Sequence, residues 1–373
     1  MDRRQFVRKG SRAAVGLAFL QSAGCASLTQ TSRKNRTPAQ LLIADLERQV
    51  PGWLKGTEVP GLSMAVIDRG RMVWRRGFGV KDAASKAPMT RDTILTCCSM
   101  TKPVFAYFVM KLHETGVLDL DTPLTKFTRE RYLQDDPRLD LITARHCLSH
   151  TTGFQNWREE DHQPLSIHFT PGTQWSYSGE GYAYLASVVT QLMRQPLEDY
   201  MQAHILSPFG MSSSTYIWTE LIGKRMAWPH DRVGRPLPQN KDRPTHESVA
   251  RYGAAGDLLT TPTDYAKFLI EVIDPKPSDA FRLTRTSRDE MLRPQVKVPN
   301  GQPPSSWALG WQIFHDGGRD FIYHGGDDSG WHTTGVACAA NKSGYVAMTN
   351  GDNGTEILSQ LIRSDSMQGF LRA

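Results

Sequence analysis

The chain has 373 residues, of which 39% are hydrophobic and 22% are charged, values that are typical of a soluble globular protein and not of a disordered one. Its formal net charge of +6 comes from the N-terminus: residues 1–36 hold eight Lys and Arg against one Asp, a net +7, which leaves −1 for the rest. A nearly neutral body offers no basic surface to DNA or RNA, so we expect no nucleic-acid partner.

Residues 1–36 predict an export signal and a linker, followed by one domain over residues 37–373. Arg3 and Arg4 precede a short apolar run, Ala13–Leu20, which is the pattern of a twin-arginine export signal and is too short to span a membrane. We therefore expect the protein to be exported to the periplasm.

A second feature of this leader bears on anchoring. The sequence "SAGC" resembles a lipoprotein cleavage box with Cys25 as the lipidated residue, although Ser22 replaces the usual leucine three positions earlier. The sequence leaves open whether the protein is free in the periplasm or tethered to the membrane through Cys25 and facing the periplasm.

The remainder alternates helical and strand-like patterns. Two strand-like runs are joined by a turn at Arg69-Gly70, and the last fifth of the chain returns to strands. Strands at both ends with helices between them predict an α/β (α+β) fold with a mostly helical subdomain over about residues 103–245. The expected elements are a helix near 41–50, a hairpin over 61–80, strands between 309 and 351, and a final helix over about 356–371.

Cysteines and histidines give no support for a metal or a cofactor. A twin-arginine substrate folds before export in a reducing cytosol, so we expect buried free thiols at Cys97, Cys98, Cys147 and Cys338. His146 and His150 have the i, i+4 spacing of a zinc pair, but no third ligand is evident.

The stretch "CCSMTKPVFA" carries the chemistry. Apolar residues after Pro103 recur at helical spacing, which places Ser99 at or near the N-cap of a helix. Residues i and i+3 are neighbours there, so Lys102 can reach the Ser99 hydroxyl. A desolvated lysine with a lowered pKa can take the serine proton, and the helix N-terminus favours the anion formed during attack.

This stretch and seven further blocks in order resemble the serine β-lactamase and penicillin-binding-protein superfamily, in particular class C-related serine hydrolases and family VIII carboxylesterases. The resemblance implies a β-lactamase/transpeptidase-like fold with an antiparallel sheet flanked by helices. The other blocks are "VPGLSMAVIDRG", "ITARHCLSHTTGF", "PGTQWSYSGEGYAYLASVV", "SPFGMSSSTY", "GAAGDLLTTPTDYAKFL", "LGWQIF" and "HGGDDSGW".

The resemblance also implies roles for individual residues. Ser99 is similar to the acylated nucleophile and Lys102 to its partner base. Tyr177, as phenol or phenolate, would share the proton traffic, and His324 would donate toward a substrate carboxylate or the Tyr177 oxygen. The backbone N–H groups of Ser99 and Asp327 would form the oxyanion hole.

Two departures from the family pattern bear on the substrate. Gly179 stands where the family has an asparagine that holds an acylamide, and Gly325 stands where it has a hydroxyl that grips a carboxylate. Gly325 and Gly326 would let a substrate backbone approach, and Trp331 is expected to line an acyl pocket. The run Arg158–Asp161 is expected to be a solvated loop.

The sequence therefore predicts a serine hydrolase that forms an acyl-enzyme on Ser99, needs no cofactor and hydrolyses carboxylic esters. A D-Ala-D-Ala carboxypeptidase or class C-type β-lactamase is the alternative, with a peptide or β-lactam as the small-molecule substrate. A non-catalytic module that binds penicillin or cell-wall peptide is a second alternative.

Overall fold

The computed structural model describes residues 36–130, 132–133, 135–159, 163–238, 243–299 and 304–373. Arg3, Arg4 and Cys25, and with them the predicted export signal and lipidation site, lie outside the described residues. Within the described ranges, no helix has the length and apolar character needed to cross a membrane.

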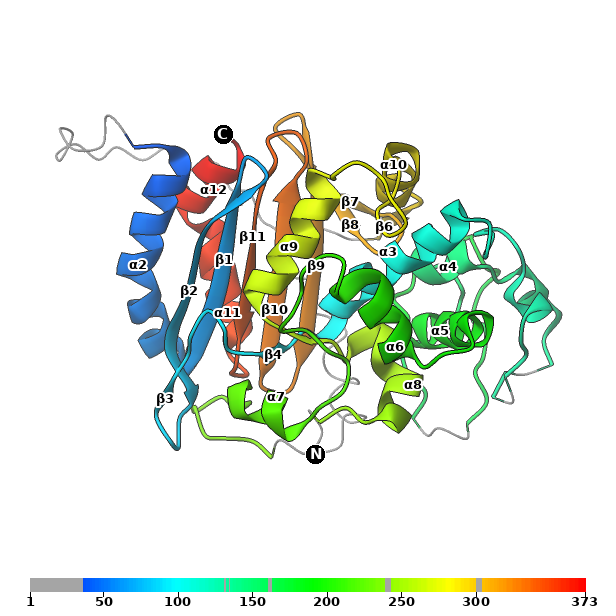
Figure 1. Cartoon of the computed structure of the whole chain (residues 1–373), viewed down its shortest axis with the longest axis horizontal. Helices are drawn as coiled ribbons and strands as arrows, with labels where there is room; N and C mark the ends of the chain where they lie inside the picture. The colour runs from blue at the N-terminus through cyan, green and yellow to red at the C-terminus, as the bar shows by residue number, and fades with distance from the viewer. Residues whose placement is uncertain (1–35, 131, 134, 160–162, 239–242, 300–303) are drawn as a thin grey trace.

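A nine-stranded antiparallel sheet forms the centre of the described chain, in the order β3-β2-β1-β11-β10-β9-β8-β7-β6 (Figure 1). The N-terminal β1 pairs with β2 on one side and with the C-terminal β11 on the other, so the two ends of the domain close one sheet. The strands are β1 (Gly61–Asp68), β2 (Arg71–Asp82), β3 (Ala87–Pro88), β6 (Val296–Val298), β7 (Ser305–Trp307), β8 (Gln312–Asp316), β9 (Arg319–Asp328), β10 (Trp331–Cys338) and β11 (Ser343–Thr349), with a separate pair β4 (Leu95–Thr96) and β5 (Leu259–Thr260).

The predicted hairpin forms as expected. Arg69 and Gly70 both have positive φ, 52° and 72°, which is the backbone of a two-residue turn that matches the twist of the flanking strands. The predicted C-terminal strands and the mixed helix-and-sheet class are also confirmed.

One face of the sheet is covered by α2 (Pro38–Thr57), α11 (Gly354–Arg363) and α12 (Asp365–Leu371), which enclose the smaller hydrophobic core (Figure 1). The single final helix expected from the sequence is two helices. Ser364 adopts an extended conformation, φ −66° and ψ 137°, and its side chain accepts a hydrogen bond from the Met367 N–H. Because that hydroxyl caps a new helix, α11 ends and α12 begins there.

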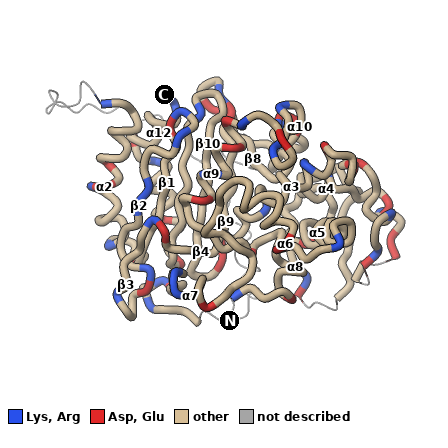
Figure 2. Tube along the Cα trace, viewed as in Figure 1, with Lys and Arg blue, Asp and Glu red and all other residues tan. Residues whose placement is uncertain are grey.

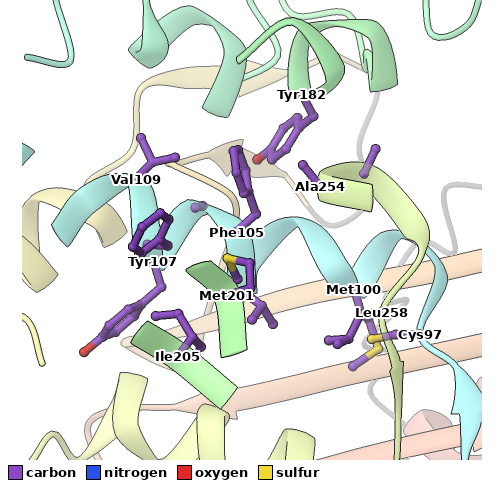
Figure 3. Packing of buried hydrophobic residues seen from close by; sticks show 14 of the residues in the cluster. Cys97, Met100, Phe105, Tyr107, Val109, Tyr182, Met201, Ile205, Ala254 and Leu258 are labelled. Carbon is purple, nitrogen blue, oxygen red and sulfur yellow. The ribbon is translucent and has the colours of Figure 1, made fainter. Parts of the chain in front are cut away.

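The other face carries the larger core and the helical region, in which α9 (Pro262–Ile273) lies against the sheet (Figure 1). Figure 3 shows α3 (Thr101–Glu114) running through this core, with Tyr182 of α5 and Ala254 of α8 close by. The other helices are α4 (Ala144–Leu148), α5 (Gly179–Met193), α6 (Leu197–Met201), α7 (Glu220–Arg225), α8 (His246–Gly256) and α10 (Arg285–Leu292).

The four cysteines after residue 36 are buried thiols that form no disulfide with one another, as predicted. Lys and Arg are interspersed with Asp and Glu over both the sheet and the helical region (Figure 2).

Candidate active site

Ser99 lies in a single 3-10 turn, Cys98–Met100, directly before α3. The N-cap of α3 is Met100, so Ser99 precedes the cap by one residue. Residues 93–98 and Met100 are buried, whereas Ser99 is partly exposed, so the turn presents its hydroxyl at the surface. Cys98 has a φ of 50°, in the left-handed region that residues with a Cβ seldom adopt. Such strain is common where a backbone must hold a reacting group in place.

Gly326 lets β9 approach this turn closely. A Cβ at position 326 would lie 2.6 Å from the Cys97 carbonyl oxygen, which is too close for any residue other than glycine. Thr333 of the neighbouring β10 donates from its Oγ1 to that same carbonyl at 3.0 Å. This contact brings Ser99 and Asp327, whose backbone N–H groups are the predicted oxyanion donors, onto adjacent segments.

Lys102 is buried beside Ser99. Its Nζ donates to Ser99 Oγ at 3.1 Å and to the Ala255 carbonyl oxygen of α8 at 2.8 Å. Burial removes water from the Lys102 amine, and this desolvation lowers its pKa to about 7. Both hydrogen-bond acceptors are neutral, so neither supplies a negative charge that would stabilise the ammonium. The nearby Cys98 opposes the shift. At neutral pH about half of the amine is unprotonated and able to accept the serine proton.

Tyr177 lies against the same amine, with Lys102 Nζ 4.8 Å from its ring centroid. Desolvation raises the pKa of Tyr177 above its usual value, and its hydrogen bond with Ser99 only partly opposes the rise. A phenolate is therefore disfavoured, which corrects the phenolate alternative from the sequence. These contacts give the role of base to Lys102 and leave Tyr177 as a neutral hydroxyl that is hydrogen-bonded with Ser99.

His324 differs from its prediction as a hydrogen-bond donor toward the site. Its Nδ1 lies 2.7 Å from the Gly325 carbonyl oxygen, which can only accept, so Nδ1 carries the proton. Burial and the Lys102 amine lower the pKa of His324 to about 3, and the ring is neutral. Its buried Nε2, which finds no partner among the described residues, is therefore an acceptor. The prediction of a donating His324 is wrong for this conformation.

His150 is a site residue that the sequence reasoning passed over. It is fully buried at a φ of 58°, and its ring centroid lies 4.2 Å from that of Tyr177. Its Nδ1 accepts from the Ser178 N–H at 3.1 Å, and burial, together with Lys102 and His324, lowers its pKa well below the usual value. This neutral ring packs against Tyr177 and limits the positions that the tyrosine can take. The signal for His150 in the sequence is its place in the "HTTGF" block.

No zinc site forms here. His146 Nδ1 lies 3.3 Å from both the N–H and the hydroxyl of Thr143, at the start of α4. In the part of the chain that the structure describes, no three His, Cys, Asp or Glu side chains are grouped to hold a metal.

Aromatic side chains occupy the space above both glycines that depart from the family pattern. A Cβ at Gly179 would lie 2.2 Å from Cζ2 of Trp157, and a Cβ at Gly325 would lie 2.5 Å from the hydroxyl oxygen of Tyr323. The sequence did not predict either contact. Tyr323 packs against the smaller core, so its hydroxyl lies on the face of the sheet opposite Ser99 and does not replace the hydroxyl absent at Gly325.

Two further expectations are corrected. Trp331 is fully buried in the larger core, so it cannot line a pocket that a substrate enters. Arg158 is not solvated: its side chain is buried and bonds from Nε to Glu180 Oε1 at 3.0 Å, because a buried carboxylate at the start of α5 provides its partner.

With this geometry in place, comparison with known proteins gives the family. The sequence profile of the family described as Beta-lactamase matches residues 43–364. The chain belongs to the β-lactamase family. Its sheet flanked by helices, with Ser99 and Lys102 at the start of α3, is the serine β-lactamase fold, and the protein is a serine hydrolase of that family.

Individual relatives show how broad this β-lactamase family is. Esterase EstB of Burkholderia gladioli is 30% identical over 328 residues, which are 73% of this chain and 80% of that protein. Unguisins hydrolase ungD of Aspergillus violaceofuscus (strain CBS 115571) is 24% identical over 353 residues, 83% of this chain, and the chain spans 61% of that protein's length. The crystal structure of D-alanine carboxypeptidase AmpC from Burkholderia cenocepacia superposes with a TM-score of 0.73 at 17% identity, covering 87% of this chain and 99% of that one, which shows a shared fold.

The lowered pKa of Lys102 predicts the pH dependence of this β-lactamase-family site. Because only the neutral amine accepts a proton, kcat/KM for a p-nitrophenyl ester should rise about tenfold per pH unit below pH 7 and level off above it. The histidines in the site stay neutral over this range and add no second inflection. Stopped-assay rates between pH 5 and 8.5 measure the profile.

Lys102→Arg is the matched variant, since a guanidinium remains protonated throughout this range. We expect it to lose about two to four orders of magnitude in kcat/KM. A flat wild-type profile between pH 5 and 8, or an Arg variant within threefold of wild type, would remove Lys102 as the base.

Proposed function

We propose that this serine hydrolase cleaves carboxylic esters through an acyl-enzyme on Ser99. The observation that carries the proposal is the Lys102 amine, 3.1 Å from Ser99 Oγ and with a pKa of about 7. It supplies a base at the nucleophile without any metal or cofactor. The similarity to a protein named as an esterase supports esters as the substrate class.

The residues divide the reaction into two half-reactions. Neutral Lys102 takes the Ser99 proton as Oγ attacks the ester carbonyl carbon, and the oxyanion is held by the backbone N–H groups of Ser99 and Asp327. The Lys102 ammonium, through the Tyr177 hydroxyl, returns that proton to the departing alkoxide, which leaves as the alcohol. Water then attacks the acyl-enzyme with Lys102 again as base, and the carboxylic acid leaves as Ser99 regains its proton.

The second candidate is a carboxypeptidase or β-lactamase activity, which the likeness to the fold of a D-alanine carboxypeptidase supports. The Tyr323 hydroxyl beside Gly325 does not supply the missing grip on a substrate carboxylate, because its ring packs against the smaller core, on the other face of the sheet from Ser99. The indole of Trp157 over Gly179 weighs against it, because an indole has one N–H donor and no acceptor and so cannot replace the side-chain amide that holds an acylamide. Esters need only the nucleophile, the base and the oxyanion hole.

We therefore expect kcat/KM for p-nitrophenyl butyrate to exceed that for a chromogenic cephalosporin by about one to three orders of magnitude. Side-by-side assays of one purified preparation measure the ratio. Ser99→Ala should abolish both activities and the mass increase from a fluorophosphonate, while its far-ultraviolet circular dichroism stays unchanged. A kcat/KM for the cephalosporin equal to that for the ester would contradict the esterase proposal and favour a β-lactamase or peptidase.

We also propose that the protein acts in the periplasm after twin-arginine export. The support is the Arg3-Arg4 pair ahead of an apolar run. Arg3→Lys together with Arg4→Lys should retain the protein in the cytoplasm, as measured by fractionation with an antibody to the mature domain. Unchanged export of the double variant would contradict this route.

Metabolic labelling with palmitate, compared between wild type and Cys25→Ser, decides whether Cys25 tethers the protein to the membrane.

A further inference from the structure

The indole of Trp157 lies directly over the backbone of Gly179, two residues beyond Tyr177. A Cβ at position 179 would be 2.2 Å from Cζ2 of the indole and 2.5 Å from both Cε2 and Cη2. Three ring atoms therefore occupy the volume that any side chain at 179 would need. Trp157 is itself only partly buried.

The residues on either side of Trp157 hold it in place. Asn156 accepts from the Gly179 N–H through Oδ1 at 2.8 Å, and its carbonyl oxygen accepts from the Glu180 N–H at 3.0 Å. Arg158 donates from its backbone N–H and its Nε to Glu180 Oε1 at 2.9 and 3.0 Å, with both side chains buried. These bonds fix the backbone on both sides of Trp157 to the first turn of α5, which places its indole over Gly179.

Trp157 also contacts α8, the helix whose Ala255 carbonyl oxygen accepts a hydrogen bond from the Lys102 amine. Its ring meets that of Tyr252 edge-on, with centroids 5.3 Å apart and an interplanar angle of 70°. Tyr252 lies on α8, one turn before Ala255, whose carbonyl oxygen accepts from Lys102 Nζ. The indole therefore contacts both of the elements that position Tyr177 and Lys102.

We propose that Trp157 sets the acyl-group specificity of the ester hydrolysis proposed above, on which this inference rests. The indole forms an apolar wall beside the acyl-enzyme and favours esters with an apolar acyl chain long enough to reach it. An acetyl group is too short to use the wall. Each methylene that leaves water for the indole should raise kcat/KM about fourfold.

The test compares p-nitrophenyl hexanoate with p-nitrophenyl acetate for each variant. Wild type should prefer hexanoate by about tenfold or more in kcat/KM. Trp157→Ala should lower that preference at least fivefold while acetate hydrolysis stays within about threefold of wild type. Gly179→Ala should also lower the preference for hexanoate, because the new Cβ displaces the indole of Trp157. This variant carries the test if Trp157→Ala does not fold.

Trp53→Ala is the matched control. Trp53 is a partly buried tryptophan that packs against the smaller core, on the other face of the sheet from Ser99, so its loss should leave the chain-length preference within twofold of wild type. An unchanged preference in folded Trp157→Ala or Gly179→Ala protein overturns the inference while the esterase proposal stands. A wild-type protein inactive on both esters overturns the esterase proposal and this inference with it.

Discussion

A lysine amine buried next to a serine hydroxyl, with neutral hydrogen-bond partners, is the interaction on which the rest of this structure depends. Moving the pKa of Lys102 from 10.5 to about 7 costs on the order of 5 kcal/mol of folding stability. The unfolded chain binds the extra proton between those two values, so the full cost applies below pH 7 and fades as the pH rises toward 10.5. The two cores offset that cost, and the larger core, which contains α3, keeps water from the amine.

The surrounding elements each constrain one part of this arrangement. The α8 carbonyl of Ala255 fixes the amine, and the buried ring of His150 limits the movement of Tyr177. The strained backbone at Cys98 turns Ser99 outward, and the missing side chain at Gly326 lets the sheet close against the turn. Closure of the sheet by the N-terminal hairpin and the C-terminal strands then makes the site dependent on both ends of the domain.

Local patterns in the sequence were sufficient for the hairpin at Arg69-Gly70, the C-terminal strands and the Ser99–Lys102 pair, because each depends on residues close together in the chain. The break at Ser364 was missed although a serine followed by an acidic residue is a cap signal that the sequence contains. The tautomer of His324 could not be predicted, since it depends on which carbonyl its Nδ1 meets. The burial of Trp331 and the contact of Trp157 with Gly179 could not be predicted, because both depend on how segments distant in the sequence pack.

The account's central claim is that Lys102 is neutral near physiological pH. Nuclear magnetic resonance of protein labelled with ¹³C at lysine Cε, titrated from pH 5 to 11 and assigned by the loss of one signal in Lys102→Met, measures its pKa directly. We expect one lysine signal, absent from Lys102→Met, to titrate near pH 7 while the exposed lysines titrate above about 10. A Lys102 signal that titrates with the others would contradict the account.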